Sequence, residues 1–205
     1  MILPSANLQS IYFYPILRGF MKSYELVLML NVSVAEADRK AFLSELESKF
    51  KVLDKDEIGV KEISFTLKGG AKQVYFVSYN VELSSADIAD LKKSLLYNPN
   101  LVRYEIFSRT TGQEFFHFET LNKSFEKAIE EIKDKRYGNK LSFFLKAENE
   151  KYLNWKSVAI LKYYLTRFGD IKPRAYTGNS VKTQKKMRTE IIRARGLGML
   201  QFINR

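Results

Sequence analysis

The sequence of 205 residues contains no cysteine and a single histidine, His117. Without cysteine there is no disulfide framework and no cysteine-ligated zinc, and any other zinc site would need several His or carboxylate side chains close together. No apolar run reaches the roughly 18 residues that a membrane-spanning helix requires. These absences argue against a disulfide-stabilised scaffold and a membrane-spanning protein, and they fit a reducing compartment.

Recognisable catalytic patterns are also missing. The sequence has no P-loop and no G-x-S-x-G, and Gly196-Leu197-Gly198 lacks the third glycine of a dinucleotide-binding fingerprint. His117 lies among phenylalanines, where a lone histidine is more often packed or at the surface than catalytic. The acid pairs Asp56-Glu57 and Glu130-Glu131 are expected to be solvated, because adjacent residues of a helix do not converge on one point. We therefore expect no enzymatic activity, no cofactor and no metal site.

The charge of the chain is unevenly distributed. The formal net charge is +11. Residues 1–139 contain 19 Lys and Arg and 19 Asp and Glu, whereas residues 140–205 contain 15 basic and 4 acidic residues. The whole excess therefore lies in the last 66 residues, which predicts a neutral module joined to one that binds a polyanion.

Residues 1–20 fit neither module. They are interpreted as an extension that is disordered or that reflects a misassigned start codon, because Met21 opens a regular pattern. A cleaved organellar presequence is the alternative, which the scarcity of basic residues disfavours.

Residues 21–110 predict the element order β-α-β-β-α-β. Strands are expected over 23–30, 61–67, 73–81 and 101–109, and a Lys68–Lys72 turn joins the middle two. One helix is expected to begin at a Ser33–Glu36 capping box and to end near Phe50, and another is expected to run from Ser84 to about Leu96. This is the ferredoxin-like plan, a four-stranded antiparallel sheet with two helices on one face.

A small, mostly helical basic module is expected to follow, which makes the whole chain α+β. Residues 111–138 are interpreted as a linker with one amphipathic helix, because Phe125, Ala128, Ile129 and Ile132 have helical spacing. Gly138-Asn139 marks the boundary to residues 139–205. There a second amphipathic helix is expected over 155–168, with Trp155 in the core.

The last predicted helix carries the basic charge. It is expected to begin after Ser180 as N-cap, to run from Val181 to Arg195 and to end at Gly196. At 100° per residue, this helix has a cationic stripe formed by Lys182, Lys185, Lys186 and Arg193. The opposite side of the helix is apolar and carries Met187, Ile191 and Ala194. A cationic row attracts a polyanion because each neutralised phosphate releases a counterion. The alternative is a solvated Lys/Arg face, which the charge distribution disfavours.

The two modules resemble two bacterial ribosomal families in tandem. Residues 21–110 resemble small-subunit ribosomal protein six, through Tyr24-Glu25-Leu26-Val27, Gly59, Tyr75-Phe76-Val77, Asn80-Val81-Glu82, Asn98 and Val102-Arg103. Residues 139–205 resemble small-subunit ribosomal protein eighteen, through Asn154-Trp155-Lys156, Leu161-Lys162-Tyr163-Tyr164-Leu165, Gly169-Asp170-Ile171-Lys172-Pro173-Arg174, Thr177-Gly178, Lys182, Gln184-Lys185 and Arg193-Ala194-Arg195. The resemblance implies a fusion of two proteins that pair on the platform of the small subunit.

The resemblance also implies a set of RNA-binding residues. The contacts would fall on Lys172, Arg174, Thr177, Lys182, Gln184, Lys185, Arg193 and Arg195, to which charge adds Lys186 and Arg188; Lys68 and Lys72 at the turn are secondary candidates. The chain departs from the family pattern at Ala175, Ile192 and Gln201, and the cysteine expected near Ser142 is absent, so the zinc site of some members cannot form.

The expected function is that of a structural component of the small ribosomal subunit. It would bind the central domain of small-subunit rRNA and help to assemble the platform beside neighbouring small-subunit proteins, with contact between its two modules. Six to ten phosphate contacts would lower the affinity roughly 10³- to 10⁵-fold between 50 and 200 mM salt. The expected location is the bacterial cytoplasmic ribosome, or an organellar ribosome. The alternatives are a translational autoregulator that binds its own mRNA leader and a peripheral module on an anionic membrane.

Overall fold

The N-terminal half forms the predicted four strands and two helices in the computed structural model of the chain. The structure describes residues 21–67, 70, 72–110, 114–134 and 143–203. The elements of this half are β1 (Lys22–Asn31), α1 (Glu36–Lys49), β2 (Lys51–Glu62), β3 (Gln73–Leu83), α2 (Ser85–Leu96) and β4 (Leu101–Ser108). The predictions for residues 1–20, for Lys68 and for the boundary at Gly138-Asn139 lie outside the described residues.

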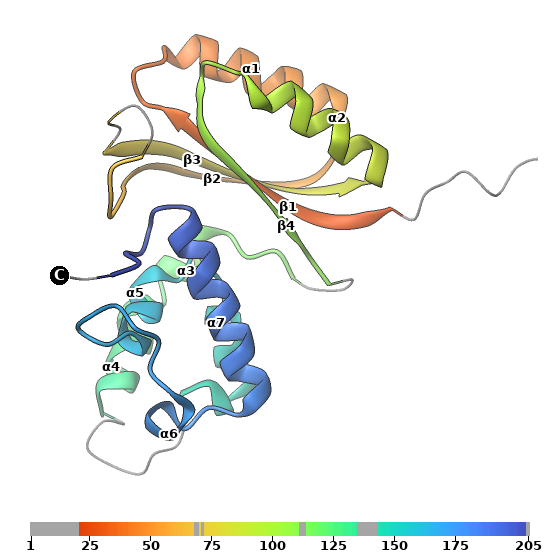
Figure 1. Cartoon of the computed structure of the whole chain (residues 1–205). Coiled ribbons are helices and arrows are strands. Elements are labelled where there is room, and N and C mark those ends of the chain that lie inside the picture. Colours follow the sequence, from red (N-terminus) through yellow and green to blue (C-terminus); the bar gives the residue numbers. More distant parts are fainter. Residues whose placement is uncertain (1–20, 68–69, 71, 111–113, 135–142, 204–205) are drawn as a thin grey trace, which may run out of the picture.

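The sheet has the ferredoxin-like order β2-β3-β1-β4, and every pairing is antiparallel. Successive strand residues point to opposite faces, so β1 supplies Leu26, Leu28 and Leu30 to one core and Val27 and Met29 to another. The first core lies under α1 and α2, which cover the same face of the sheet in Figure 1. The predicted fold class is confirmed.

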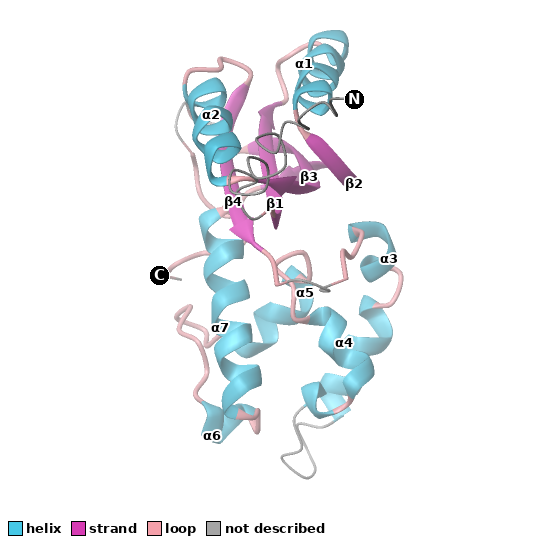
Figure 2. Cartoon of the chain, turned by 90° about the vertical axis from the view of Figure 1, so that its right-hand side faces the viewer, coloured by secondary structure: helices cyan, strands magenta, loops and turns pink. Residues whose placement is uncertain are grey.

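The C-terminal half is helical and lies against the other face of the sheet (Figures 1 and 2). Its elements are α3 (Phe118–Asn122), α4 (Phe125–Asp134), η1 (Phe143–Leu145), η2 (Ala147–Tyr152), α5 (Val158–Leu161), η3 (Lys162–Tyr164), α6 (Arg174–Thr177) and α7 (Val181–Gly196). We call residues 114–203 the helical module. Val27 and Phe76 of the sheet belong to the same buried cluster as Trp155 and Ile191 of this module. The two halves therefore share a continuous apolar core.

Two helix starts test the capping predictions. The Ser84–Asp87 capping box is present, with the Ser84 hydroxyl accepting from Asp87 N–H and the Asp87 carboxylate accepting from Ser84 N–H. The Ser33–Glu36 box is wrong, because α1 begins at Glu36 after Ala35 and has no side-chain cap. Ser33 instead donates its N–H to the side chain of Asn31, which closes the turn after β1.

The second strand lies ten residues earlier than the prediction for 61–67. β2 is an edge strand rich in charged residues, and its register shifts between Val52 and Asp54 and again between Glu57 and Gly59, so its alternation is broken. The apolar residues after it pack against the C-terminal tail instead of continuing the ladder. Ser64 N–H donates to the carbonyl oxygen of Gly198 at 2.7 Å. Gly198 has a φ of 75°, and a Cβ there would lie 3.4 Å from Ile63.

Two predictions for the helical module also need correction. The linker contains two helices, α3 and α4, where one was expected, although Ala128 and Ile132 are buried as their spacing predicts. The helix expected over 155–168 is only α5 followed by the single turn η3. Leu165 leaves the helical region and bridges to Ile171, and residues between them form a turn in which Thr166 N–H donates to Asp170 O at 2.7 Å.

Candidate nucleic-acid interface

The orientation of α7 follows from its sequence pattern. The Ser180 hydroxyl accepts from Thr183 N–H at 3.1 Å and fixes the start of the helix, as predicted. Met187, Ile191 and Ala194 are 0% exposed and hold the helix against the module. Gly196 does not end the helix as a left-handed cap, because it is the last helical residue and the left-handed glycine is Gly198.

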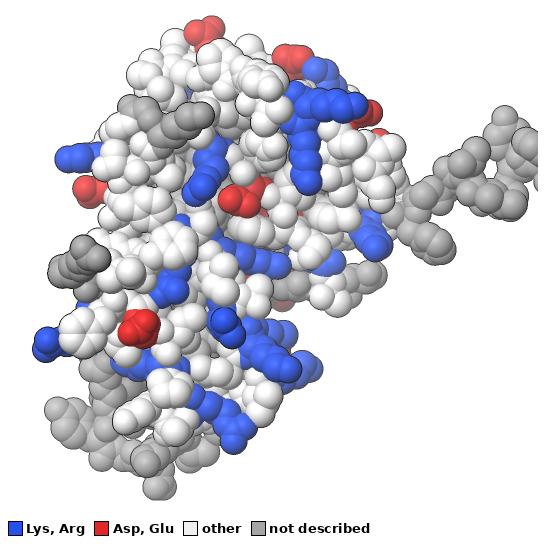
Figure 3. All heavy atoms as spheres, viewed as in Figure 1, with Lys and Arg blue, Asp and Glu red and all other residues white. Residues whose placement is uncertain are grey.

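Four predicted RNA-binding cations are exposed, and their side chains make no hydrogen bond or ion pair within the part of the chain that the structure describes. They are Arg174 on α6 and Lys182, Lys185 and Arg188 on α7. We call these four the free cations. Figure 3 shows blue side chains gathered along the side of the molecule where α7 lies. Because α6 leads directly into α7, these charges form one continuous surface.

Three other predicted cations are engaged by the protein itself. Lys186 pairs with Glu150 of η2, at the surface. Arg193 donates to Glu190 at 2.9 Å and to the carbonyl oxygen of Ser108 at 3.3 Å, so it connects α7 with the end of β4. Arg195 donates to the carbonyl oxygens of Gly169 and Gln201, so it holds the turn before α6 and the C-terminal tail. The expectation that Arg193 lies on the solvent stripe is therefore wrong.

The remaining predicted residues brace the loop that carries α6. Lys172 Nζ donates to Tyr163 O at 2.6 Å, and Gln184 Nε2 donates to Lys172 O at 2.8 Å. The Thr177 hydroxyl donates to Gln184 Oε1 at 3.1 Å. These bonds fix the position of Arg174 relative to α7. A polar side chain in this loop thus has a structural task, whether or not it also contacts a ligand.

Of the secondary candidates at the β2–β3 turn, only Lys72 lies within the described residues, and it is not brought to this surface. Lys72 is exposed. The segment before the turn contacts Gly198, after the C-terminal end of α7, whereas Lys182 and Lys185 lie in the N-terminal half of that helix. At 1.5 Å per residue, Lys185 is about 20 Å from Gly198 along the helix axis.

A groove of about 990 Å³ runs along α7. One wall carries Lys182, Lys185 and Lys186, and the opposite wall comes from Ser108 and Thr110 at the end of β4 and from residues of η2. Glu148 and Glu150 also line it, so the groove is of mixed charge. Two of the free cations, Lys182 and Lys185, line the groove on its α7 side.

Sequence reasoning missed a cluster of charges buried between the sheet and the helical module. Asp56 is 5% exposed, which contradicts the expectation that Asp56 and Glu57 are both solvated. The expectation applied helix geometry to a strand, where neighbours point to opposite faces. Asp56 points under the helical module and pairs with Lys156, whereas Glu57 is exposed and pairs with Lys55. The pattern that could have revealed the cluster is Lys156 itself, a cation that directly follows Trp155 and precedes the apolar run Val158–Leu161.

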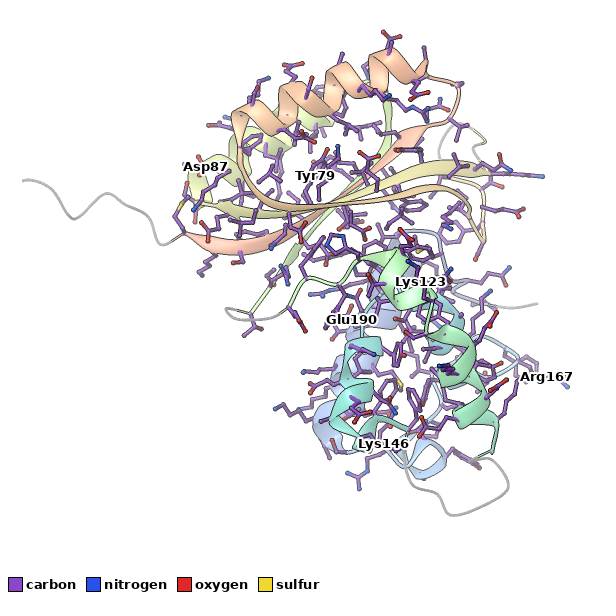
Figure 4. The ribbon with its side chains drawn as sticks, turned by 180° about the vertical axis from the view of Figure 1, so that it is seen from behind. Tyr79, Asp87, Lys123, Lys146, Arg167 and Glu190 are labelled. Carbon is purple, nitrogen blue, oxygen red and sulfur yellow. The ribbon has the colours of Figure 1, made fainter. Side chains whose placement is uncertain are left out.

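Glu190 is the buried acid of α7. Figure 4 places it at the boundary between the sheet and the helical module, and it is 8% exposed. Its Oε2 accepts from Trp155 N–H at 3.0 Å and its Oε1 accepts from Arg193. Burial raises the pKa of Glu190 to about 7, although Arg193 and the Trp155 N–H act in the opposite direction.

The raised pKa of Glu190 predicts a pH dependence of stability. The Glu190 carboxyl group has its ordinary pKa of 4.5 in the unfolded state, so the folded state binds the proton of this group more tightly. The resulting stabilisation of the folded state is present below pH 4.5 and is lost as the pH rises through about 7. The loss amounts to about 3 kcal/mol. Urea denaturation at pH 5 and pH 8 measures it. Glu190→Gln should remove this part of the pH dependence, and an unchanged slope in that variant would contradict the assignment.

Two features are absent from the described residues. No group of three or more His, Asp or Glu side chains there is placed to hold a metal ion. No helix there has both the length and the apolar character needed to cross a membrane.

Comparison with known proteins covers both halves of the chain. The family model described as ribosomal protein S18 matches residues 149–200. The small ribosomal subunit protein bS18 of Mycoplasma capricolum is 36% identical over 73 residues, which are 36% of this chain and 96% of that protein. The bS18 protein of Lactobacillus delbrueckii is 40% identical over 57 residues, which are 28% of this chain and 73% of that protein.

Relatives of the N-terminal half belong to a different family. The small ribosomal subunit protein bS6 of Buchnera aphidicola is 33% identical over 101 residues, covering 46% of this chain and 76% of that protein. The crystal structure of 30S ribosomal protein S6 from Thermotoga maritima aligns with 16% identity and a TM-score of 0.41, covering 53% of this chain and 98% of that one. The predicted resemblance is confirmed: the chain belongs to the small ribosomal subunit protein family bS6 through its N-terminal half and to the family bS18 through its C-terminal half.

Proposed function

We propose that the chain binds the central domain of small-subunit rRNA and helps to assemble the platform, with both partners of the usual pair on one polypeptide. The observation that carries the proposal is the surface of the four free cations on α6 and α7. All four side chains are exposed, and α7, which carries three of them, is held against the module by its fully buried Met187, Ile191 and Ala194. Lysine and arginine would position the module on phosphates, and the shape of the folded RNA would supply specificity.

The pairing of the two modules within one chain is part of this proposal. It is supported by the shared apolar core and by polar contacts such as that of Arg193 with Ser108 O. We further propose that neighbouring small-subunit proteins are its partners and that it works on a bacterial ribosome in the cytoplasm. The relatives give no support to the mRNA-leader or membrane alternatives.

The salt dependence of RNA binding tests the proposal. If the free cations make the phosphate contacts, four contacts predict a fall in affinity of about 50- to 150-fold between 50 and 200 mM salt, less than six to ten contacts would give. Filter binding of the full chain to central-domain RNA measures this slope. A flat response would overturn the phosphate contacts.

Two competition measurements separate the alternatives. An mRNA leader that displaces central-domain RNA at equal concentration would favour autoregulation. Sedimentation with anionic liposomes, at the salt concentration where RNA is bound, would favour the membrane. We expect neither result.

A further inference from the structure

The face of the sheet that meets the helical module is not purely apolar. Glu25 on β1 and Asp56 on β2 lie on this face, and each is 5% exposed. Glu25 alternates with Val27 and Met29, which belong to the core shared by the two halves. The Ser78 hydroxyl donates to Glu25 Oε1 at 2.8 Å. We call Glu25 and Asp56 the carboxylate pair.

One lysine of the helical module enters this face. Lys156 is 0% exposed, and its Nζ lies 2.6 Å from Asp56 Oδ2 and 3.6 Å from Glu25 Oε1. The same ammonium donates to the carbonyl oxygen of Phe116 at 2.9 Å and lies 4.1 Å from the centre of the Phe115 ring. Two carboxylates, a carbonyl oxygen and an aromatic ring therefore surround the cation within the protein.

Asp56 is held in place for this contact. Its Oδ2 also accepts from the backbone N–H of Phe118 at 2.9 Å, at the start of α3. His117 Nδ1 lies 3.8 Å from Asp56 Oδ1, and His117 Nε2 lies 3.1 Å from Asp54. Asp56 thus contacts both the segment that leaves the sheet and the lysine that returns to it, 100 residues further along the chain.

We propose that the contact of Lys156 with the carboxylate pair determines which helical module this sheet accepts. Apolar burial drives docking, but it is non-directional and would accept any apolar surface of suitable shape. A module without a cation at this position would leave both carboxylates buried without their ammonium partner, and the hydrogen bonds from Ser78 and the Phe118 N–H do not replace its charge. Removing one partner of a buried ion pair is strongly unfavourable. The sheet would thus discriminate between helical modules because a module without the cation is penalised, which is one way in which charge supplies specificity. The proposal rests on the pairing of the two modules within one chain.

The competing view is that the apolar contacts alone determine docking, so that loss of the Lys156 charge would leave the two modules joined. Buried ion pairs often contribute little net stability compared with apolar residues of the same size. The two views predict different results when the charge of Lys156 is removed alone and when the charges of its acidic partners are then changed as well. If charge complementarity determines docking, a single change separates the modules and a compensating change restores them.

The full chain carries its own probe for this test. Trp155 is the only tryptophan, it precedes Lys156 and it is 0% exposed in the shared core. Acrylamide quenching of its fluorescence reports separation of the modules, and circular dichroism reports whether each variant is folded. For Lys156→Met and Lys156→Glu we expect the docking equilibrium to fall on the order of 10²- to 10³-fold. Both should show strong quenching with retained helix content.

Two second-site variants decide between the views. Lys156→Glu with Asp56→Lys exchanges the charges, and Lys156→Met with Asp56→Asn and Glu25→Gln removes them. We expect at least one of the two to recover the protection of Trp155. A Lys156→Met chain that remains protected would overturn the proposal, and so would failure of both compensating variants. Because no RNA is present in these measurements, their failure would leave the free cations and RNA binding untouched.

Discussion

Replacing Lys182 and Lys185 together with glutamate is expected to weaken binding to central-domain RNA by about 10²-fold at 0.1 M salt. Each phosphate contact contributes roughly five- to eightfold at this salt concentration through counterion release, and the two acids add repulsion. Both lysines are exposed, and their side chains make no hydrogen bond or ion pair among the described residues, so the fold should be unaffected. Filter binding measures the affinity, and circular dichroism and Trp155 fluorescence check the fold.

The chain offers a matched control for this pair of changes. Lys92 and Lys93 are adjacent exposed lysines on α2, on the face of the sheet away from the helical module. Lys92→Glu with Lys93→Glu also lowers the formal charge from +11 to +7, because each exchange removes two units. If binding depends on a surface rather than on net charge, this control should bind nearly as well as the unchanged chain. Equal losses in the two variants would refute the assignment to α7.

The sheet could be predicted from the sequence where packing demands a simple pattern. β1 and β3 are central strands buried on both faces, and their apolar runs gave their positions within two residues. The position of the edge strand β2 was predicted wrongly because two register shifts break the alternation of its residues. In addition, one of its faces is exposed to solvent, and the other carries Asp56, which pairs with Lys156. Local pattern cannot show that Ile63 packs against a tail 135 residues away.

The candidate surface was predictable to a similar degree. Helical periodicity correctly separated the buried residues Met187, Ile191 and Ala194 of α7 from the exposed Lys182, Lys185 and Lys186, because this separation depends on one helix alone. Arg188 was added on charge alone. It could not show which cations are engaged by other parts of the protein. Arg193 and Arg195 carry the same charge as Lys182, but carbonyl oxygens of β4 and of the turn before α6 occupy them. A count of basic residues therefore overestimates the phosphate contacts.

The charge asymmetry has two structural consequences. The four free cations stand at the surface of α6 and α7, where phosphates can reach them. The cation that matters for joining the halves, Lys156, is instead fully buried against acids of the neutral module. A change to a free cation should thus alter RNA affinity without altering stability, whereas a change at Lys156 should alter the docking of the modules first.

Ile191→Asp is expected to unfold the helical module, whereas Ile192→Asp should leave it folded. Ile191 is 0% exposed in the shared core, and its neighbour is 50% exposed on the same helix. A buried unpaired carboxylate together with the lost apolar contacts costs about 4 kcal/mol or more, a large part of the roughly 5–15 kcal/mol that holds a domain folded. The exposed substitution should change stability by about 0.5 kcal/mol.

Urea denaturation followed by Trp155 fluorescence compares the two variants directly. The Ile191→Asp chain should show an exposed tryptophan before denaturant is added, because Trp155 and Ile191 belong to the same buried cluster. The β-sheet signal should persist, since α1 and α2 cover a separate core on the other face of the sheet. Identical unfolding midpoints for the two variants would mean that α7 presents a different side to the module, and the free cations would then no longer be the residues that face RNA.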